Sequence, residues 1–323
     1  MKIGLFTNCF PDKSWEETCR ITSEAGIRGI EPGAGGFPST GHCKPSELLK
    51  SEDNIKEFIR TAQKYGLEIY GFDVQGNPLH PDKGYAEKHR KDLEDAIELA
   101  GRVGAEVVNC FAGCPGAAED DPYPNWVCCY YPDYFSKALK WQWEKKIVPF
   151  WNEMVLKARK YGVRFGFEMH VGDSVYNVHT LLKLREMTGA EEIGACIDFG
   201  QLFVFGMDPI ACIKELGKNN AIHNVHTQDT KINKQAIALK GVNDYANYSE
   251  LNNRSWVFKL VGYGHGAETW TDIVDTLRMA GYDGYLTIEN LDALISAEEG
   301  LKKAVKFLNS IIFHESAGDR RLE

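Results

Sequence analysis

Four apolar segments in the second half of the 323-residue chain each end in an acidic or imidazole side chain. The residues are Glu168, with His170 two positions later, then Asp198, His226 and Glu289. Inside a strand such a group would be buried at a cost of several kcal/mol unless it were paired. At the carboxyl ends of consecutive parallel strands the same groups would converge on one side of a sheet. Two Glu, one Asp and one His suit Mn²⁺, Mg²⁺, Co²⁺ or Zn²⁺, and the three carboxylates would repel one another without a cation.

The elements that must position these groups alternate along the whole chain. Short β-rich runs are each followed by a helical pattern, which is typical of repeated βα units. The expected strands are Lys2–Thr7, Arg28–Glu31, Leu67–Asp73, Glu106–Cys110, Val163–Met169, Ile193–Asp198, Ile222–His226 and Tyr285–Glu289. The expected helices are Ser14–Ala25, Asn54–Tyr65, Tyr85–Val103, Trp143–Tyr161, Thr180–Met187, Pro209–Leu216, Trp270–Ala280 and Ala297–Ile311. This pattern predicts an α/β fold of one domain, a (β/α)₈ TIM barrel over residues 1–323.

Glycines and two long connections refine this prediction. Five expected helices end at a glycine directly before the next strand, namely Gly26, Gly66, Gly104, Gly162 and Gly281. The connections Phe111–Trp141, after strand four, and Thr227–Thr269, after strand seven, exceed the ~2–6 residues usual in βα units. Loops that follow barrel strands lie at the catalytic face, so both are expected to wall or cover a pocket. The first loop is rich in aromatic residues, including Trp126, which would form either an oligomer contact or a stacking wall for a sugar ring or phenolic group.

A doubly wound sheet is the competing architecture. Residues Gly262–Ala267 fit the G-x-G-x-x-A pattern of dinucleotide-binding turns, and Glu289 follows at a suitable distance. However, the motif lies near the end of the chain rather than in the first βα turn, and no second mononucleotide half follows it. The context therefore favours the barrel.

Composition excludes several classes of function. The formal net charge is −9, whereas a protein that binds nucleic-acid phosphates usually has a basic excess. No segment approaches the ~20 apolar residues of a membrane span, and the N-terminus has too short an apolar run for a secretion signal. The nine cysteines lack the spacing of zinc knuckles or a disulfide framework and are expected to be unpaired. A cytoplasmic protein with no membrane or nucleic-acid partner is expected.

Several segments resemble the xylose-isomerase-like superfamily of TIM barrels, which includes sugar isomerases, keto-sugar 3-epimerases and inosose dehydratases. The similarity covers nearly the whole chain, and its most specific segments are Glu168–His170, Ile197–Gln201, Val225–Thr230 and Ile288–Glu289. The resemblance implies one divalent metal, with Mn²⁺ favoured, on a set of ligands that this chain keeps in full: Glu168, Asp198, His226 and Glu289.

The departures from the family pattern lie on the substrate side. Gln201 stands where the family usually has His, Gln228 where it usually has Lys, and Asn290 where His or Asp is common. Neutral amides in place of cationic groups argue against a phosphorylated or strongly anionic substrate. Together with the Glu168-x-His170 spacing, this pattern resembles the larger (α) subunit of bacterial C-glycoside deglycosidases. That resemblance implies a small-molecule glycoside substrate, a small β-rich partner subunit and an oligomer.

The chemistry implied by the resemblance is removal of a proton α to a carbonyl, with the metal stabilising the enediolate. His170 is the expected base, because it lies two residues beyond Glu168 and on the same side of the strand. In an isomerase or epimerase, Glu168 and Glu289 could instead act as paired bases. In a lyase, the enolate would expel the aryl group of a 3-oxo-C-glucoside. The substrate contacts expected here are His80, Gln201, Asp229, His265, Asn77 and Trp126.

Three classes of function follow from these observations. The favoured one is a metal-dependent keto-sugar enzyme, specifically a carbon–carbon lyase that cleaves 3-oxo-C-glucosides, with an aldose–ketose isomerase or ketose 3-epimerase as the alternative. A non-catalytic barrel scaffold is a remote alternative, because four intact ligands count against it. An abasic-site endonuclease is another remote alternative. Those relatives need further His, Asp and Glu ligands and a basic surface, and the net charge of −9 counts against them.

Overall fold

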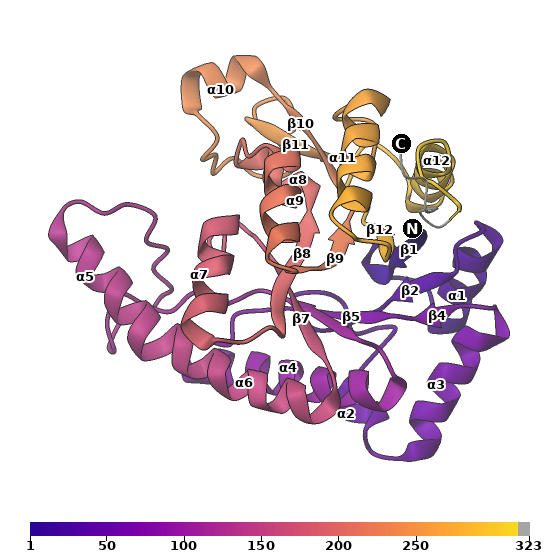
Figure 1. Ribbon diagram of the computed structural model, residues 1–323, viewed down its shortest axis with the longest axis horizontal. Coiled ribbons are helices and arrows are strands. Elements are labelled where there is room, and N and C mark those ends of the chain that lie inside the picture. The colour runs from indigo at the N-terminus through magenta and orange to yellow at the C-terminus, as the bar shows by residue number, and fades with distance from the viewer. Residues whose placement is uncertain (316–323) are drawn as a thin grey trace, which may run out of the picture.

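Parallel strands alternate with helices from one end of the chain to the other in the computed structural model, which describes residues 1–315 (Figure 1). Ten strands form one sheet in the order β3-β5-β6-β7-β8-β9-β12-β1-β2-β4. Their bounds are β1 Lys2–Phe6, β2 Gly29–Glu31, β3 Gly33–Gly36, β4 Glu68–Ile69, β5 Gly71–Gln75, β6 Val107–Cys110, β7 Arg164–Glu168, β8 Ile193–Asp198, β9 Ile222–His226 and β12 Tyr285–Ile288.

The sheet curls round and closes into a barrel. The strands at its two ends, β3 and β4, are continuations of β2 and β5, which lie near the opposite ends of the sheet. β2 and β3 are separated by Pro32 alone, and β4 and β5 by Tyr70 alone. β2 pairs in parallel with β4, and β3 with β5. The backbone N–H of Asp73 donates to the carbonyl of Pro32 across the interruption, at 3.1 Å. When β2 with β3 and β4 with β5 are each counted as one interrupted strand, the ten strands are the eight parallel strands of a TIM barrel. The predicted fold class is confirmed.

All eight predicted strands are present, with ends that shift by at most two residues apart from the break at Tyr70. β3 is an additional strand that was not predicted, because its residues Gly33-Ala-Gly-Gly36 have low strand propensity. The loop after β9 contains a second feature that was not predicted, an antiparallel hairpin formed by β10 Asp229–Ile232 and β11 Trp256–Lys259. The loop after β9 therefore has regular secondary structure of its own.

Helices surround the sheet (Figure 1). The α-helices are α1 Trp15–Glu24, α2 Pro45–Leu48, α3 Glu52–Lys64, α4 Lys83–Val103, α5 Asp133–Trp141, α6 Val148–Tyr161, α7 Val178–Thr188, α8 Phe199–Val204, α9 Pro209–Lys218, α10 Lys234–Lys240, α11 Ala267–Met279 and α12 Ala297–Asn309. A 3₁₀ turn covers Thr7–Cys9, and a π-helical segment, Gln142–Ile147, joins α5 to α6, so the helix predicted to begin at Trp143 is part of a longer one. All five predicted glycine stops have positive φ, for example 87° at Gly104, the left-handed conformation that glycine adopts readily.

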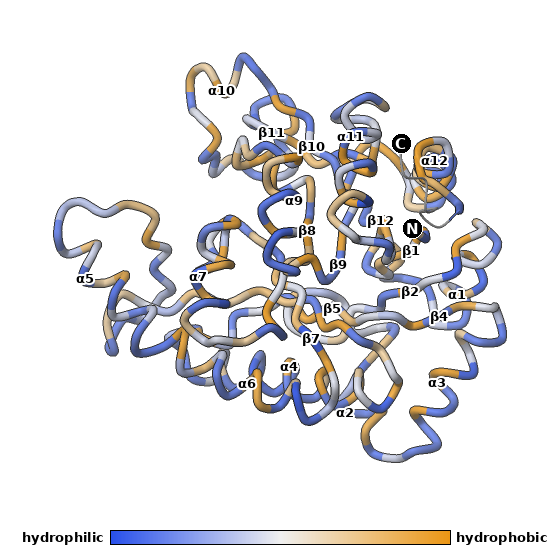
Figure 2. Tube along the Cα trace, viewed as in Figure 1, coloured by the Kyte–Doolittle hydropathy of each residue, from blue (hydrophilic) through white to orange (hydrophobic). Residues whose placement is uncertain are grey.

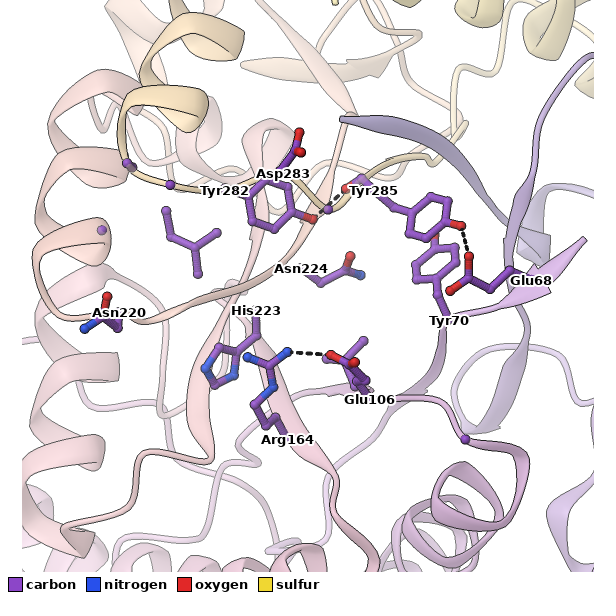
Figure 3. A pocket seen from close by; sticks show the side chains of 17 residues that line it. Glu68, Tyr70, Glu106, Arg164, Asn220, His223, Asn224, Tyr282, Asp283 and Tyr285 are labelled. Carbon is purple, nitrogen blue, oxygen red and sulfur yellow. Dashed lines mark hydrogen bonds and ion pairs between the residues drawn. The ribbon is translucent and has the colours of Figure 1, made fainter. Parts of the chain in front are cut away.

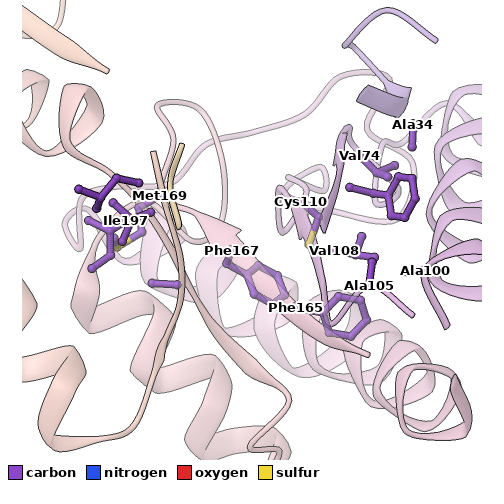
Figure 4. Close-up of a cluster of buried hydrophobic side chains, with 14 of the residues drawn as sticks. Ala34, Val74, Ala100, Ala105, Val108, Cys110, Phe165, Phe167, Met169 and Ile197 are labelled. Atoms are coloured by element: carbon purple, nitrogen blue, oxygen red, sulfur yellow. The ribbon is translucent and has the colours of Figure 1, made fainter. Parts of the chain in front are cut away.

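Successive side chains of β7 point alternately to the helix layer and to the barrel interior. Phe165 and Phe167 belong to the cluster of buried hydrophobic side chains that Figure 4 shows. They point outward to the helix layer, where the Trp151 ring of α6 lies 5.2 Å and 4.5 Å from theirs. Burial of each ring contributes about 1.5–3 kcal/mol. Gly166 and Glu168 therefore face the barrel interior. In Figure 2 the helices alternate between hydrophobic and hydrophilic segments, as expected when one face packs on a sheet.

Two further observations bear on the class of protein. No helix in residues 1–315 is both long and apolar enough to cross a membrane. All nine cysteines are free; Cys128 and Cys129 are exposed, and the others are buried or partly buried.

Candidate active site

The four predicted ligands lie at the same end of the barrel because each terminates a parallel strand. Glu168 is the last residue of β7, Asp198 of β8 and His226 of β9, and Glu289 directly follows β12. Strand register keeps them level, since Asp198 pairs with His226, and His226 with Thr287. All four side chains are buried.

Their contacts leave acceptor atoms unused. Nδ1 of His226 lies 2.9 Å from Oε2 of Glu289. Oδ1 of Asp198 accepts a hydrogen bond from the backbone N–H of Gly200 at 2.7 Å, whereas its Oδ2 is buried without a partner. Glu168 accepts a hydrogen bond from the amide of Gln75 on β5. Buried carboxylate oxygens without donors are costly unless a cation or proton compensates them.

Electrostatics at this end of the barrel disfavour three separate negative charges. Burial, and then the Glu289 carboxylate, raise the pKa of Glu168 to about 8. Burial, followed by Glu168 and Glu289, raises the pKa of Asp198 well above its ordinary value. These shifts are those of a like-charge cluster, in which a bound cation would favour the ionised form.

The donor set fits a divalent metal. Three carboxylates and one imidazole are ligands that Mn²⁺, Mg²⁺, Co²⁺ and Zn²⁺ accept. Two ligand atoms that bind one ion at ~2.1 Å and at right angles would lie ~3 Å apart. The 2.9 Å between His226 Nδ1 and Glu289 Oε2 is of this size. The unpartnered Oδ2 of Asp198 is a further available acceptor.

A second buried group, which was not predicted from the sequence, lies deeper in the barrel. Glu31 of β2 lies 2.8 Å from Nε2 of His226, and Asp73 of β5 lies 3.8 Å from the same atom. Within residues 1–315, Glu31, Asp73 and His226 form the one group of at least three such residues whose potential ligand atoms all lie within 4.8 Å of one another. The signal was present, because Glu31 and Asp73 also ended predicted strands.

His170 lies at the mouth of the barrel, in the same cavity wall as Glu168 and Glu289. Its Nδ1 is 2.8 Å from the carbonyl oxygen of Val171 and therefore carries the ring proton when the imidazole is neutral. The Phe111 ring packs against the imidazole, with centroids 4.7 Å apart. Burial lowers the pKa of His170, so the ring is neutral at pH 7 and Nε2 is free to accept a proton.

A cavity of about 410 Å³ opens above these residues. Its polar wall contains Gln75, Glu168, His170, Gln201, Gln228 and Glu289. Its apolar wall contains Phe37, Phe111, Tyr248, Phe258 and Leu291, and among the described residues that line it there is no Lys or Arg. A second hollow of similar volume shares His170, Gln201 and Tyr248 with the first. The two hollows together are therefore longer than one sugar ring requires. Within residues 1–315, the first has no cationic side chain in its wall, whereas Arg254 lines the second.

The two predicted long loops contribute unequally to this cavity. The loop after β9 supplies Gln228, Tyr248 and Phe258, whereas the loop after β6 supplies Phe111. The expected aromatic wall therefore comes from other residues than those proposed. Tyr130 and Tyr131 are 78% and 83% exposed.

Gln201 is the predicted substrate contact that lines the cavity, and its Oε1 is buried without a partner. Gln228, across the same cavity, has both amide atoms buried and unpartnered. These two amides are therefore available to sugar hydroxyl groups.

Asp229 and His265, also predicted as substrate contacts, hold a turn together. Oδ2 of Asp229 accepts hydrogen bonds from the backbone N–H groups of Gly262, Gly264 and His265 and from the Trp270 indole, at 2.9–3.1 Å. Oδ1 of Asp229 faces Nδ1 of His265 at 2.8 Å. The glycine-rich segment Gly262–Ala267 thus closes the long loop after β9 through its hydrogen bonds to Asp229. Its role is structural rather than dinucleotide-binding.

The other three predicted contacts also lie outside the cavity wall. Asn77 bonds to both the N–H and the carbonyl of Cys114 and so ties two loops together. Nδ1 of His80 accepts a hydrogen bond from the N–H of Asp82. Trp126 lines a separate hollow and packs edge-on against Tyr176, with centroids 5.4 Å apart. That Asn77, His80 and Trp126 bind substrate stays a prediction. Their positions outside the cavity wall do not favour it.

Another hollow, of about 460 Å³, lies at the opposite end of the barrel (Figure 3). Its wall includes His223 and Asn224 at the start of β9, with Arg164, Tyr282 and Tyr285. Arg164 pairs with Glu106, and the Tyr285 hydroxyl donates to Glu68, as the dashed lines show (Figure 3). In TIM barrels this amino-terminal end serves stability rather than chemistry.

Comparison with known proteins gives the class. A family model described as xylose isomerase-like TIM barrel matches residues 19–311. The chain therefore belongs to this family, which includes sugar isomerases and epimerases.

Individual relatives match over nearly their whole length. The chain is 31% identical to the uncharacterized protein YfiH of Bacillus subtilis over 97% of this chain and 99% of that protein. The solved structure of the probable 3-DHS dehydratase AsbF of Bacillus anthracis aligns with a TM-score of 0.67 and 18% identity, over 96% of this chain and 99% of AsbF. The IolI protein, solved with a bound zinc atom, aligns with a TM-score of 0.66 and 15% identity, over 98% and 100%.

Proposed function

We propose that this chain is a divalent-metal-dependent enzyme that removes a proton α to the carbonyl of a keto-sugar. One observation carries the proposal: the buried carboxylates of Glu168 and Glu289 line a cavity that His170 also faces. Asp198 and His226 are buried at the ends of the neighbouring strands, on the same side of the barrel. The residues that would hold the metal, with Mn²⁺ favoured, are Glu168, Asp198, His226 and Glu289. When bound, the cation supplies Lewis-acid stabilisation of the enediolate. The zinc atom in the IolI structure is consistent with such a site.

His170 is the proposed base. Because the carbonyl of Val171 holds its Nδ1–H, the lone pair of Nε2 is the one available to take the α-proton. Gln201 and Gln228 are proposed to hydrogen-bond the sugar hydroxyl groups, since Oε1 of Gln201 and both amide atoms of Gln228 have no other partner. Neutral hydrogen-bonding groups orient the ring without requiring a phosphate.

The specific reaction we propose is cleavage of a 3-oxo-C-glucoside, as in the catalytic α subunit of a C-deglycosidase. His170 removes the proton from C2 of the sugar, and a C2–C3 enolate forms. The electron pair then re-forms the C3 carbonyl and makes a C1–C2 double bond, and the bond from C1 to the aryl carbon breaks. A proton delivered to that carbon completes the phenolic product, so no oxidant or reductant is consumed.

Two features of the cavity favour a glycoside over a free sugar. Phe37, Phe111, Tyr248 and Phe258 supply aromatic surface beyond the polar wall. The adjoining hollow, lined by Tyr248 and Trp256, extends the space past one ring. Aromatic faces stack on phenolic rings and on the C–H faces of sugars.

An aldose–ketose isomerase or ketose 3-epimerase is the second candidate. It rests on Glu168 and Glu289, two carboxylates that face the same cavity and could move a proton on opposite faces of a sugar. In that case His170 would be secondary, and free ketoses would be the substrates.

The experiment combines metal analysis with hydrogen exchange. The purified chain is analysed for bound metal, loaded with Mn²⁺ and incubated in D₂O with free ketoses or 3-oxo-C-glucosides, with and without a small β-rich partner subunit where one can be co-purified. Exchange or aglycone release from the 3-oxo-glucosides alone is the expected result. Exchange on free ketoses would favour the isomerase or epimerase instead.

A matched pair of variants ties the reaction to the site. Glu289→Gln is expected to lose both metal and activity. Glu298→Gln, at an exposed position in the first turn of α12, makes the same chemical change and should retain both. Absence of metal and of exchange in the unmodified chain would overturn the proposal and leave a non-catalytic scaffold.

A further inference from the structure

The imidazole of His226 is held between two carboxylates inside the barrel. Nδ1 lies 2.9 Å from Oε2 of Glu289, at the mouth, and Nε2 lies 2.8 Å from Oε1 of Glu31, on the inner side. Both Glu31 and His226 have no exposed surface. The Phe6 ring stacks on the imidazole, with centroids 5.7 Å apart and planes 26° from parallel. The ring is thus fixed in position and in rotation.

Glu31 is itself held in place for this contact. Its other oxygen, Oε2, accepts a hydrogen bond from the Asn224 amide at 2.7 Å. Asn224 precedes His226 by two residues on β9, so both side chains project from the same face of one strand. Glu31 therefore bridges two successive inward positions of β9 from across the barrel.

A histidine can bind a metal through one nitrogen only if that nitrogen carries no proton. A buried carboxylate beside Nε2 favours the tautomer with its proton on Nε2, because that proton forms a hydrogen bond to the carboxylate. In the tautomer with its proton on Nδ1, the carboxylate would face the lone pair of Nε2. When the proton is on Nε2, the lone pair of Nδ1 is directed toward Oε2 of Glu289, another proposed metal ligand, 2.9 Å away.

We propose that Glu31 is a positioning residue that holds His226 in the tautomer with its proton on Nε2 and its Nδ1 free to bind the metal. This inference rests on the proposed function, since it assumes that His226 is a metal ligand. It assigns a role to a residue outside the cavity wall, which reaches a substrate only through His226.

Asp73 provides the matched control. It is as buried as Glu31 and belongs to the same inner group, but its Oδ2 is 3.8 Å from Nε2 of His226, beyond hydrogen-bond distance. It accepts a hydrogen bond from Asn109 at 3.3 Å and also lies close to Glu31, to which an asparagine at this position can still donate a hydrogen bond. Asp73→Asn should therefore change metal binding far less than a substitution of Glu31. The rival role for the inner group is a second cation between Glu31, Asp73 and His226, which would make both acids equally important.

The test is a titration of the metal-free chain with Co²⁺ and Zn²⁺, followed by calorimetry and by the visible absorption of Co²⁺. The unmodified chain should bind one equivalent. Glu31→Met, which removes the acceptor at similar volume, should weaken binding about 10- to 100-fold and alter the Co²⁺ spectrum. Glu31→Gln, which keeps an acceptor oxygen, should lie between the two, and Asp73→Asn should stay within about threefold of the unmodified chain.

A second readout locates the proton directly. In ¹⁵N–¹H correlation spectra of the Zn²⁺-loaded chain, His226 should carry its proton on Nε2, and this signal should be lost or divided in Glu31→Met. Circular dichroism establishes that each variant is folded, and Glu31→Gln carries the test if the Met variant is not.

The outcomes separate this inference from the proposed function. Unchanged affinity and spectra in both Glu31 variants, in a chain that binds metal and is active, would overturn the positioning role alone. Two equivalents of metal, one of them lost in Asp73→Asn, would overturn it in favour of an inner cation. No metal binding by the unmodified chain would overturn both proposals together.

Discussion

Nδ1 of His170 lies 2.8 Å from the carbonyl oxygen of Val171, the next residue in the chain. A carbonyl oxygen accepts only, so the imidazole must donate from Nδ1, and Nε2 becomes the acceptor. This local contact gives the ring the tautomer that a general base needs, while the adjacent Phe111 ring restricts its rotation. The tautomer follows from a backbone turn directly after β7 rather than from a partner acid.

We expect His170→Ala to reduce turnover about 10²- to 10⁴-fold, the range of a lost general base. Its metal content should be unchanged, because the four proposed ligands remain. Turnover is measured by aglycone release under saturating substrate, and metal by elemental analysis. His314→Ala, at an exposed position near the C-terminus, is the control. Near-normal turnover in His170→Ala would show that another group is the base.

The aromatic wall makes a second prediction. Tyr248 lines both hollows at the mouth, so Tyr248→Ala should raise KM for an aryl glycoside about tenfold, the loss expected from one stacking contact of ~1.5 kcal/mol. The KM of a free ketose should change little, because a single ring fits the polar end. Tyr123→Ala, in which the replaced ring is 76% exposed, should affect neither substrate. Equal effects of Tyr248→Ala on both substrates would mean that Tyr248 contacts the sugar itself.

The sequence predicted the eight strands well because each combines an apolar run with a glycine stop before it or a polar group after it. Ile193–Asp198 and Ile222–His226 agree with the structure at both ends. β3 escaped because Gly33-Ala-Gly-Gly36 has neither apolar alternation nor β-branched residues. The hairpin of β10 and β11 escaped because its strands lie 23 residues apart and pair only through the tertiary fold.

The predicted site was incomplete for a different reason. An acid or imidazole at the end of a predicted strand marks the site in the last four strands, and Glu31 and Asp73 also end predicted strands but lie deeper in the barrel, beside His226. Conversely, Asp229 was expected to face a substrate because of its motif. Its oxygens instead satisfy backbone N–H groups more than 30 positions away in the chain, a relationship that no local pattern reveals.

Asp229→Asn tests that structural role. The amide would place N–H hydrogens against the donors of Gly262, Gly264 and Trp270, so at least one buried donor loses its acceptor. We expect a loss of about 2–3 kcal/mol in the free energy of unfolding, measured by urea denaturation. Asp120→Asn, at an exposed position, should cost almost nothing. A stable variant with a raised KM would instead support the original prediction that Asp229 binds substrate.

His223, at the amino-terminal end of β9, predicts how stability depends on pH. Burial lowers its pKa from 6.5 to about 4 in the folded chain, where Nδ1 is 2.7 Å from the carbonyl of Phe165. The unfolded chain therefore binds a proton near pH 6.5 that the folded chain does not bind until about pH 4. Stability must fall as the pH drops below 6.5, by about 2 kcal/mol between pH 7 and pH 5 from this residue.

The measurement is urea denaturation of the unmodified chain and of His223→Gln at pH 7, 6 and 5. Glutamine can donate to the Phe165 carbonyl but does not titrate, so the variant should lose about 2 kcal/mol less than the unmodified chain over this interval. His314→Gln, at an exposed position, should show the same pH dependence as the unmodified chain. If His223→Gln and the unmodified chain lost equal stability between pH 7 and pH 5, the imidazole would not be held neutral by burial, and the loss would have to come from other groups.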